Sequence, residues 1–291
     1  MKGFATVGEL EMTMTSRDGA PVSPAGRKVN IKLMKNEESP AVNAGMVRQG
    51  LQSRMSSLVP LKAGGGTPIF IAHGLGDTVM QLLQLATRME VSHPIYGMQA
   101  RGLDGIEEPL ERIEDMAEFH LDAIRELQAH GPYFLIGYSL GGLVTLEMAR
   151  RLKASGDEVA LLVMLDSYPD RRHLTVGQRV RVEWRLATRR FSGLLRPDGK
   201  SEITTGALQR VKDAQYRALR KYRPAFYDGK VKFLRAAIPS YFPADPVPVW
   251  SGVVRELEVE TVPGTHLEML TTQVEAVASL VERYVKESLV G

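Results

Sequence analysis

The feature that most constrains the fold is a regular alternation between short apolar runs and longer amphipathic segments, which begins at Pro68. The apolar runs PIFIAHG, PIYGMQARG, PYFLIGYS and EVALLVMLDS each have the length of a strand, and helical patterns separate them. Strands of continuous apolar character are typical of a parallel sheet that is covered by helices on both faces. The sequence therefore predicts an α/β fold with a mostly parallel sheet.

The alternation stops between residues 176 and 227, where the pattern is helical and rich in arginine. It resumes with GKVKFLRAAI and LEVETVPG, and it ends with a helical pattern from about Thr272 to Leu289. Because the same alternation continues afterwards, we interpret residues from about 171 to 229 as a helical lid inserted into one domain of residues 58–291. Residues 1–57 form an N-terminal extension, which is either a hairpin or partly disordered.

The composition is that of a soluble globular protein, with 44% hydrophobic and 24% charged residues. No apolar run approaches the roughly 20 residues that span a bilayer. The first residues, MKGFATVGELEMTMTSRDG, lack the apolar middle of a signal peptide. We therefore predict a cytoplasmic protein that does not bind membranes. The absence of cysteine excludes disulfides, thiolate metal sites and cysteine catalysis.

The charge is distributed unevenly along the chain. Residues 171–232 contain 17 Lys/Arg against 5 Asp/Glu, whereas the remainder contains 20 against 29. A basic block within an acidic chain suggests an anionic partner, although arginines solvated on helix faces would give the same composition. The block has no aromatic residues interleaved with basic ones and no nucleic-acid-binding motif, so we predict no nucleic-acid partner.

One serine lies where a strand is expected to turn into a helix. Gly137–Gly141 reads G-Y-S-L-G, the pattern in which glycines relieve the crowding around a strained nucleophilic serine. A purely structural glycine turn could contain the same residues. The apolar run before it and the helical pattern after it favour Ser139 as a nucleophile.

A nucleophilic serine needs a base and an acid that orients it. Among six histidines, only His266 follows an expected strand and a Pro-Gly turn and precedes an expected helix. This context places it at the carboxyl edge of the sheet, where open parallel sheets carry their active sites, although a structural role is the alternative. Asp166 ends the run ALLVML and projects from the same edge. The order Ser139, Asp166, His266 is that of an α/β-hydrolase triad.

Such a site also needs an oxyanion hole. We expect one donor to be the backbone N–H of Leu140, which directly follows the serine at a helix N-terminus. We expect the other to be the N–H of Leu75, within the sequence HGLGDT that follows the first strong strand. The predicted chemistry requires no metal and no redox cofactor.

With these motifs in place, the sequence resembles a known family. The segments PIFIAHGLGD, IYGMQARGL, GPYFLIGYSLGGLVTLEMARRL, LLVMLDSYP and VPGTHLEML are similar to the thioesterase domains that terminate nonribosomal peptide and polyketide synthases. The resemblance runs from about Leu58 to the C-terminus, and it implies an α/β-hydrolase fold with a helical lid. Ser139, Asp166 and His266 fall on the family's triad. The loop H-G-L-G-D departs from the proline and paired glycines that are usual there.

The resemblance also implies a function and a partner. Family members remove an acyl or peptidyl chain from a phosphopantetheine thiol through an acyl-serine ester and pass it to water or an internal nucleophile. Carrier proteins are usually acidic, so we expect Arg185, Arg189 and Arg190 of the lid to hold the carrier. The alternatives are a carboxylesterase or acyltransferase that acts on free esters or CoA thioesters, and a non-catalytic hydrolase homologue that binds acyl carriers.

Overall fold

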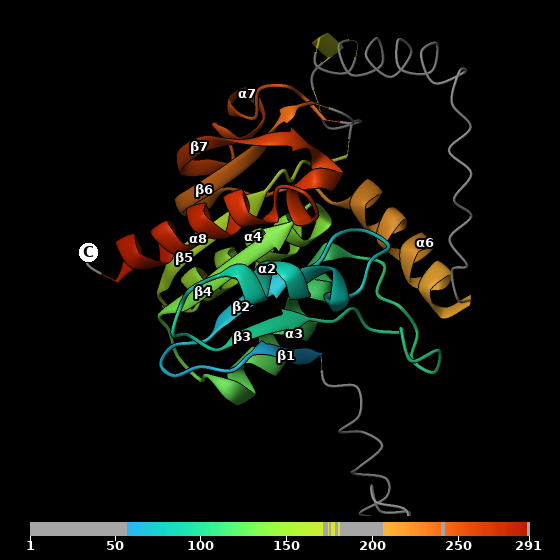
Figure 1. The fold of residues 1–291 in the computed structure, drawn as a ribbon. Helices are drawn as coiled ribbons and strands as arrows, with labels where there is room; N and C mark the ends of the chain where they lie inside the picture. The colour runs from blue at the N-terminus through green and yellow to red at the C-terminus, as the bar shows by residue number, and fades with distance from the viewer. Residues whose placement is uncertain are drawn as a thin grey trace, which may run out of the picture. The chain divides into compact units, whose positions relative to one another are not determined.

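The computed structural model describes residues 57–170, 174, 176–177, 180, 206–239 and 242–289. Their centre is a seven-stranded sheet with the order β1-β3-β2-β4-β5-β6-β7 (Figure 1). In chain order, the strands are β1 (Leu58–Lys62), β2 (Ile69–Ala72), β3 (Ile95–Met98), β4 (Tyr133–Tyr138), β5 (Val159–Leu165), β6 (Tyr227–Ile238) and β7 (Val254–Thr265). Every neighbouring pair is parallel except β1, which runs antiparallel to β3. The predicted mostly parallel sheet is confirmed.

The helices connect these strands in the way that parallel pairing requires. In chain order, they are the 3₁₀ turn η2 (Val79–Leu82), α2 (Leu83–Arg88), α3 (Ile113–Leu127), α4 (Leu140–Ala154), α6 (Gly206–Lys221), α7 (Val247–Trp250), the 3₁₀ turn η4 (His266–Leu270) and α8 (Val274–Ser288). The helical pattern between PIFIAHG and PIYGMQARG forms η2 followed by α2, which ends at Arg88. It ends there because Met89 has an extended backbone, with φ −67° and ψ 117°.

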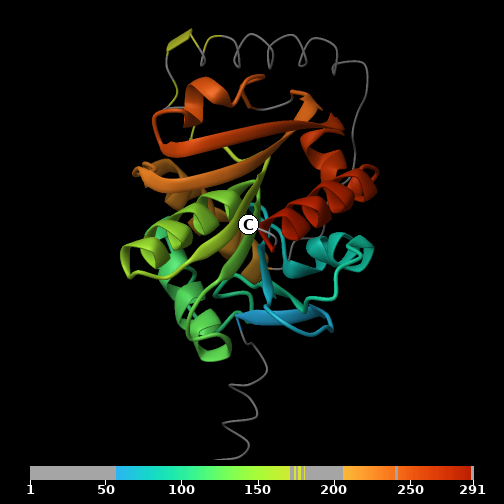
Figure 2. The same ribbon diagram turned by 90° about the vertical axis from the view of Figure 1, so that its left-hand side faces the viewer.

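The core is divided by the sheet into two layers. Successive side chains of a strand point to opposite faces, so Phe70 and Ala72 belong to one layer and Ile69 and Ile71 to the other. The first layer packs against α3 and α4, and the second against α2 and α8. Figure 2 shows α3 and α4 (green) on one side of the sheet and α2 and α8 (teal and red) on the other. Helices on both faces are what the continuous apolar strands predicted.

The predicted lid is described in part. Helix α6 lies within it and buries Val211, Ala214 and Ala218. Residues 171–173, 175, 178–179 and 181–205 lie outside the described residues, as does the N-terminal extension apart from Ser57. Of the helices that the structure describes, none combines the length and the apolar character needed to cross a membrane.

Candidate active site

Ser139 lies at the sharp turn between β4 and α4. Its backbone has φ 54° and ψ −117°, a conformation that is strained for a residue with a side chain. The Ser139 N–H donates to the carbonyl of Leu165 at 2.9 Å, so β5 holds the turn in place. The serine is half-buried, whereas Tyr138 and Leu140 on either side are buried. This geometry fits a nucleophile elbow.

Two glycines of the motif are required by close packing. A Cβ atom at Gly137 would lie 2.3 Å from the carbonyl oxygen of Gly141, and one at Gly141 would lie 2.4 Å from that of Ala72. The second contact shows that the N-terminus of α4 packs directly against the end of β2. The Leu140 N–H is in the first turn of α4, where helix amides have no intrahelical acceptor, and Leu75 follows β2 by three residues. Both expected oxyanion donors therefore belong to segments that meet at this edge.

Asp166 and His266 form a buried pair at the same edge. Asp166 Oδ2 lies 2.8 Å from His266 Nδ1, and the two residues are only 5% and 6% exposed. Asp166 Oδ1 accepts from the N–H of Ala236 at 3.2 Å, and the Asp166 N–H donates to the carbonyl of Leu234 at 2.7 Å, so β6 fixes the carboxylate. A carboxylate can only accept, so the proton of the neutral imidazole lies on Nδ1 and Nε2 is left as a base.

Aromatic rings hold the imidazole of His266 on two sides. The Tyr138 ring stacks on it, with centroids 4.7 Å apart and an interplanar angle of 18°, and Phe242 packs edge-on at 5.0 Å. The Tyr138 hydroxyl also donates to the His266 carbonyl at 2.9 Å. Because Tyr138 directly precedes Ser139, this stack brings the imidazole to the elbow. Burial, with the charges of Asp166 and Asp77, raises the pKa of Tyr138, which keeps its hydroxyl a donor.

A capping box fixes the backbone at His266. The carboxylate of Glu268 accepts from the N–H of Thr265 at 2.6 Å, and the Thr265 side chain accepts from the Glu268 N–H in return. Hydrogen bonds from Thr265 lower the pKa of Glu268, which keeps it ionised at neutral pH. His266 follows the cap directly and begins η4. The capping box thus fixes the backbone of the turn that carries the imidazole.

Two other histidines are buried nearby and are unsuited to be the base. Burial lowers the pKa of His73, against a weaker opposite effect of its bond to Gly74, and burial together with the charge of His73 lowers the pKa of His120 to about 3. Both line a cavity of about 30 Å³ between the end of β2, α3, α4 and α6, with Gln215 on its α6 side. That volume is large enough for at least one water molecule. Within the described part of the chain, His120 Nδ1 has no hydrogen-bond partner.

The structure describes only part of the basic block of residues 171–232, and some of its basic side chains form ion pairs within the chain. Arg185, Arg189 and Arg190 lie outside the described residues. On α6, Arg217 and Lys221 both pair with Glu111. These two basic side chains therefore share one carboxylate within the chain.

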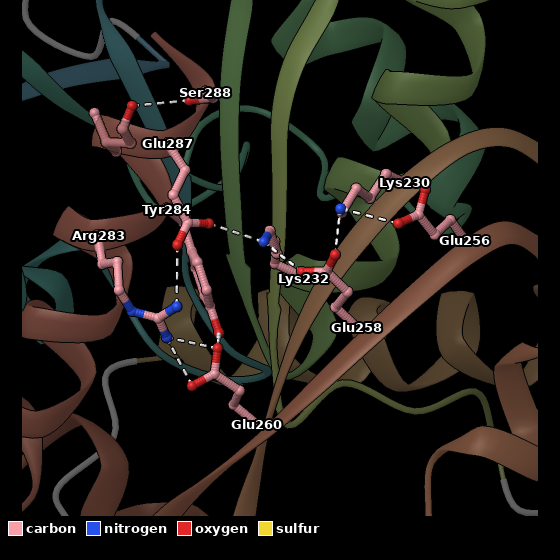
Figure 3. Close-up of polar contacts among 10 residues, drawn as sticks. Lys230, Lys232, Glu256, Glu258, Glu260, Arg283, Tyr284, Glu287 and Ser288 are labelled. Atoms are coloured by element: carbon pink, nitrogen blue, oxygen red, sulfur yellow. Dashed lines mark hydrogen bonds and ion pairs between the residues drawn. The ribbon is translucent and has the colours of Figure 1, made fainter. Parts of the chain in front are cut away.

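Two lysines of β6 also form ion pairs with acidic side chains of the chain. Lys230 pairs with Glu256 and Glu258, and Lys232 pairs with Glu258 and Glu287, at the amino-terminal halves of β6 and β7 (Figure 3). These lysines lie toward the edge of the sheet opposite the candidate site. Among the described residues, no group of three or more His, Cys, Asp or Glu side chains could hold a metal ion.

The sequence did not identify three residues that shape the site. Tyr138 lies within the G-Y-S-L-G motif, so its position beside the serine was a usable signal. Phe242 and Gln215 carried no signal, because each reaches the site from a segment distant in the chain. Phe242 contacts His266 from the connection after β6, and Gln215 comes from α6.

Comparison with known proteins assigns the chain to one family. The sequence profile of the family described as "Thioesterase domain" matches residues 67–285. A dimodular nonribosomal peptide synthase of Bacillus subtilis is 31% identical over 241 residues, covering 72% of this chain and 10% of the synthase. Enterobactin synthase component F of Escherichia coli is 26% identical over 222 residues, covering 74% of this chain and 17% of that protein. The chain thus spans a small part of the curated relatives that it matches.

Solved structures have the same fold. The NocB thioesterase domain, in covalent complex with a fluorophosphonate nocardicin G analogue, superposes with a TM-score of 0.62 at 22% identity, covering 78% of this chain and 99% of that one. The type II thioesterase BorB superposes with a TM-score of 0.61 at 20% identity, covering 79% and 98%. At these identities the likeness concerns the α/β-hydrolase fold alone.

Proposed function

From the premise that this chain belongs to the thioesterase domain family, we propose that it releases an acyl or peptidyl chain from a phosphopantetheine thioester through an ester on Ser139. The observation that carries the proposal is the buried hydrogen bond between Asp166 and His266 beside the strained serine turn. The bond leaves the imidazole Nε2 as the base, and the backbone at Ser139 is held in the geometry of an elbow.

The first half-reaction acylates the serine. His266 Nε2 takes the proton of the Ser139 hydroxyl while the serine oxygen bonds to the thioester carbonyl carbon. The N–H groups of Leu140 and Leu75 stabilise the resulting oxyanion. The carbon–sulfur bond then breaks, and the imidazolium returns the proton to the leaving thiolate. Asp166 stabilises the imidazolium throughout without taking its proton.

The second half-reaction releases the chain. Water, or a nucleophile of the acyl chain itself, gives its proton to His266 Nε2 and attacks the ester carbonyl. The bond from the carbonyl carbon to the serine oxygen breaks, and the proton returns to Ser139. Every proton that the cycle needs is thus carried by one imidazole.

The proposal is tested by intact mass spectrometry after incubation with a panel of acyl-pantetheine thioesters. We expect one acyl adduct on Ser139, and none in Ser139→Ala or His266→Ala. Ser251→Ala, which alters an exposed turn serine, is the control and should acylate normally. Acylation that survives in His266→Ala would contradict the assigned base.

The same preparation separates the alternatives. Higher kcat/KM on oxygen esters than on matched pantetheine thioesters would identify a carboxylesterase. Failure of a fluorophosphonate to modify Ser139 would identify a non-catalytic homologue.

We further propose an acidic carrier protein as the partner, with Arg185, Arg189 and Arg190 as contacts. The proposal rests on the basic block of residues 171–232, in which 17 Lys/Arg face 5 Asp/Glu in sequence. The ion pairs described above involve only a few of these basic residues. Changing these arginines to glutamate should slow release from a carrier-bound thioester and leave a small pantetheine thioester unaffected. Equal slowing of both substrates would contradict the steering role.

A further inference from the structure

We infer that Gln215, on the lid helix α6, is a positioning residue for the loop that supplies the Leu75 oxyanion donor. The inference rests on the proposed function, because it assigns Gln215 a role in acylating Ser139. The observation behind it is one hydrogen bond, in which the N–H of Gly76 donates to Gln215 Oε1 at 2.7 Å. This bond links the loop after β2 to a helix 139 residues later in the chain.

The peptide before Leu75 is fixed by a histidine. His73 Nδ1 donates to the carbonyl of Gly74 at 2.8 Å, because a carbonyl can only accept. His73 Nε2 accepts from the N–H of Ala100 at 3.3 Å, which sets the same tautomer. In a trans peptide the C=O and the next N–H point in opposite directions. By holding the Gly74 carbonyl, His73 thus sets the direction of the Leu75 N–H.

The peptide after Leu75 is fixed by Gln215. Its N–H belongs to Gly76, and Gln215 accepts from it. Both peptide planes that flank the Leu75 Cα are therefore held by side chains, one from the end of β2 and one from α6. Without Gln215, the second plane loses this hydrogen bond, and side-chain hydrogen bonds no longer fix the dihedral angles at Leu75 from both sides.

The contact between α6 and the loop is close, and it is buried on the α6 side. Gln215 is 4% exposed, and a Cβ atom placed on Gly76 would lie 2.9 Å from Cδ of Lys212, so helix and loop are in direct van der Waals contact. A hydrogen bond in such surroundings is stronger than one in water. Gly76 itself is only partly buried, but a water molecule that replaced Gln215 Oε1 would not be fixed in position as a packed side chain is.

Other contacts attach α6 to the body of the protein. Arg210 donates to the Gly105 carbonyl at 2.9 Å, and Arg217 pairs with Glu111 at 2.9 Å. Loss of the Gln215 bond therefore leaves the helix docked and releases only the loop. The Gln215 bond is thus a contact through which α6 constrains the loop that carries the oxyanion donor.

The test measures how fast a fluorophosphonate modifies Ser139, because the phosphonyl oxygen occupies the oxyanion hole as the serine attacks. Gln215→Met has nearly the same shape but cannot accept the hydrogen bond. We expect modification to slow about tenfold to a hundredfold, which is less than the loss of a whole oxyanion donor. Gln215→Glu retains an acceptor and should stay within about threefold of the unaltered chain by the same reasoning. Gln209→Met, on the exposed surface of α6, is the matched control and should have no effect.

Steady-state kinetics on an acyl-pantetheine thioester add a second readout. A positioning defect removes stabilisation made only in the transition state, so kcat should fall in Gln215→Met with KM nearly unchanged. Thermal unfolding of each variant shows whether α6 is still docked.

The outcomes separate the inference from the proposed function. No modification of Ser139 in the unaltered chain would overturn both. Normal modification with no slowing in Gln215→Met would overturn the inference alone. Equal slowing in Gln215→Met and Gln215→Glu would also overturn it, because the packing of the side chain rather than its hydrogen bond would then matter.

Discussion

The two ends of the sheet hold their polar groups in opposite ways. At the carboxyl ends of β4 and β5, Ser139 and Asp166 have positive φ angles, and Asp166 bonds to His266 out of contact with solvent. At the amino-terminal halves of β6 and β7, lysines and glutamates form a network of ion pairs that water reaches. One end depends on a few buried contacts, and the other shares its charge among many exposed ones.

This difference teaches where substitutions should matter. A buried polar group that loses its partner has no water to replace it, whereas an exposed ion pair exchanges its partner for solvent at little cost. We therefore expect large and specific effects at the carboxyl end and small, salt-dependent ones at the amino end. Four substitutions test this ordering, from the largest expected effect to the smallest.

Asp166→Asn should have the largest effect. The amide keeps the shape of the carboxylate, but it can donate to Nδ1 and so favours the wrong tautomer of His266. We expect the rate of acylation to fall by about 10⁴-fold, as in triads of this kind. The measurement is single-turnover acylation of Ser139, with Glu258→Gln as a control that should acylate at the normal rate. A loss smaller than about tenfold would show that Asp166 does not set the tautomer.

Glu147→Gln tests a case between these two. Glu147 is buried, as the polar groups at the carboxyl end are, but it forms ion pairs, as the lysines and glutamates at the amino end do. Glu147 is 2% exposed and accepts hydrogen bonds from Arg150 at 2.7 Å and Arg151 at 2.9 Å. We expect the free energy of unfolding to fall by about 2 kcal/mol at pH 7, measured with denaturant. The exposed Glu118, which also pairs with Arg151, provides the control, and Glu118→Gln should cost less than about 1 kcal/mol.

The contribution of Glu147 should also depend on pH. Burial is the largest single cause and raises its pKa, but the hydrogen bonds and the positive charges of Arg150 and Arg151 together outweigh burial, so the pKa is lowered from 4.5. A carboxyl whose pKa is lower in the folded state stabilises the fold above the unfolded pKa. That stability is lost as the pH falls through the folded pKa. The difference between Glu147→Gln and the unaltered chain should therefore shrink below pH 4.5, and a constant difference would contradict this account.

Tyr138→Phe should have a smaller effect at the carboxyl end. It removes the hydroxyl that bonds to the His266 carbonyl and keeps the ring that stacks on the imidazole. We expect a loss of about 1 kcal/mol in the free energy of unfolding, and less than a tenfold change in turnover. Tyr138→Leu also removes the stack and should lower turnover further. Equal turnover in the two variants would mean that the ring does not position the imidazole.

Glu258→Gln should have the smallest effect. Glu258 is bonded by Lys230 and Lys232, which lowers its pKa, but more than a third of its side chain is exposed. Solvent screening limits the cost to less than about 1 kcal/mol. The cost should decrease further when unfolding is measured in high salt. A larger cost that is independent of salt would remove the contrast between the two ends of the sheet.

Much of the fold could be predicted because its strands are unambiguous. β4 and β5 are continuous apolar runs, and α4 (Leu140–Ala154) lies where the helical pattern after Ser139 predicted a helix. β7 begins at Val254, three residues before the expected strand LEVETVPG, and the added residues include Arg255 and Glu256, which look solvent-exposed in sequence although Glu256 pairs with Lys230 of β6. A pattern of hydrophobicity along the sequence does not reveal such ion pairs between strands.

The candidate site was predictable where a residue follows a strand. Asp166 directly follows β5 and His266 directly follows β7, so both lie at the carboxyl edge of the sheet, and their positions in sequence could place them there. The contacts of Phe242 with the imidazole and of Gln215 with Gly76 depend on how separate segments fold back on the sheet. Such contacts follow from packing in three dimensions, which the spacing of residues in sequence does not encode.

The place of β7 in the sheet has a consequence for heat inactivation. β7 is the last strand in the order, its one strand partner among the described residues is β6, and its end leads into His266. Edge segments open locally with less free energy than the core does. Opening there separates His266 from Asp166 while the remaining strands stay paired. We therefore expect turnover to be lost several degrees below the unfolding midpoint and to return on cooling, with the amides of β7 exchanging hydrogen before those of β4.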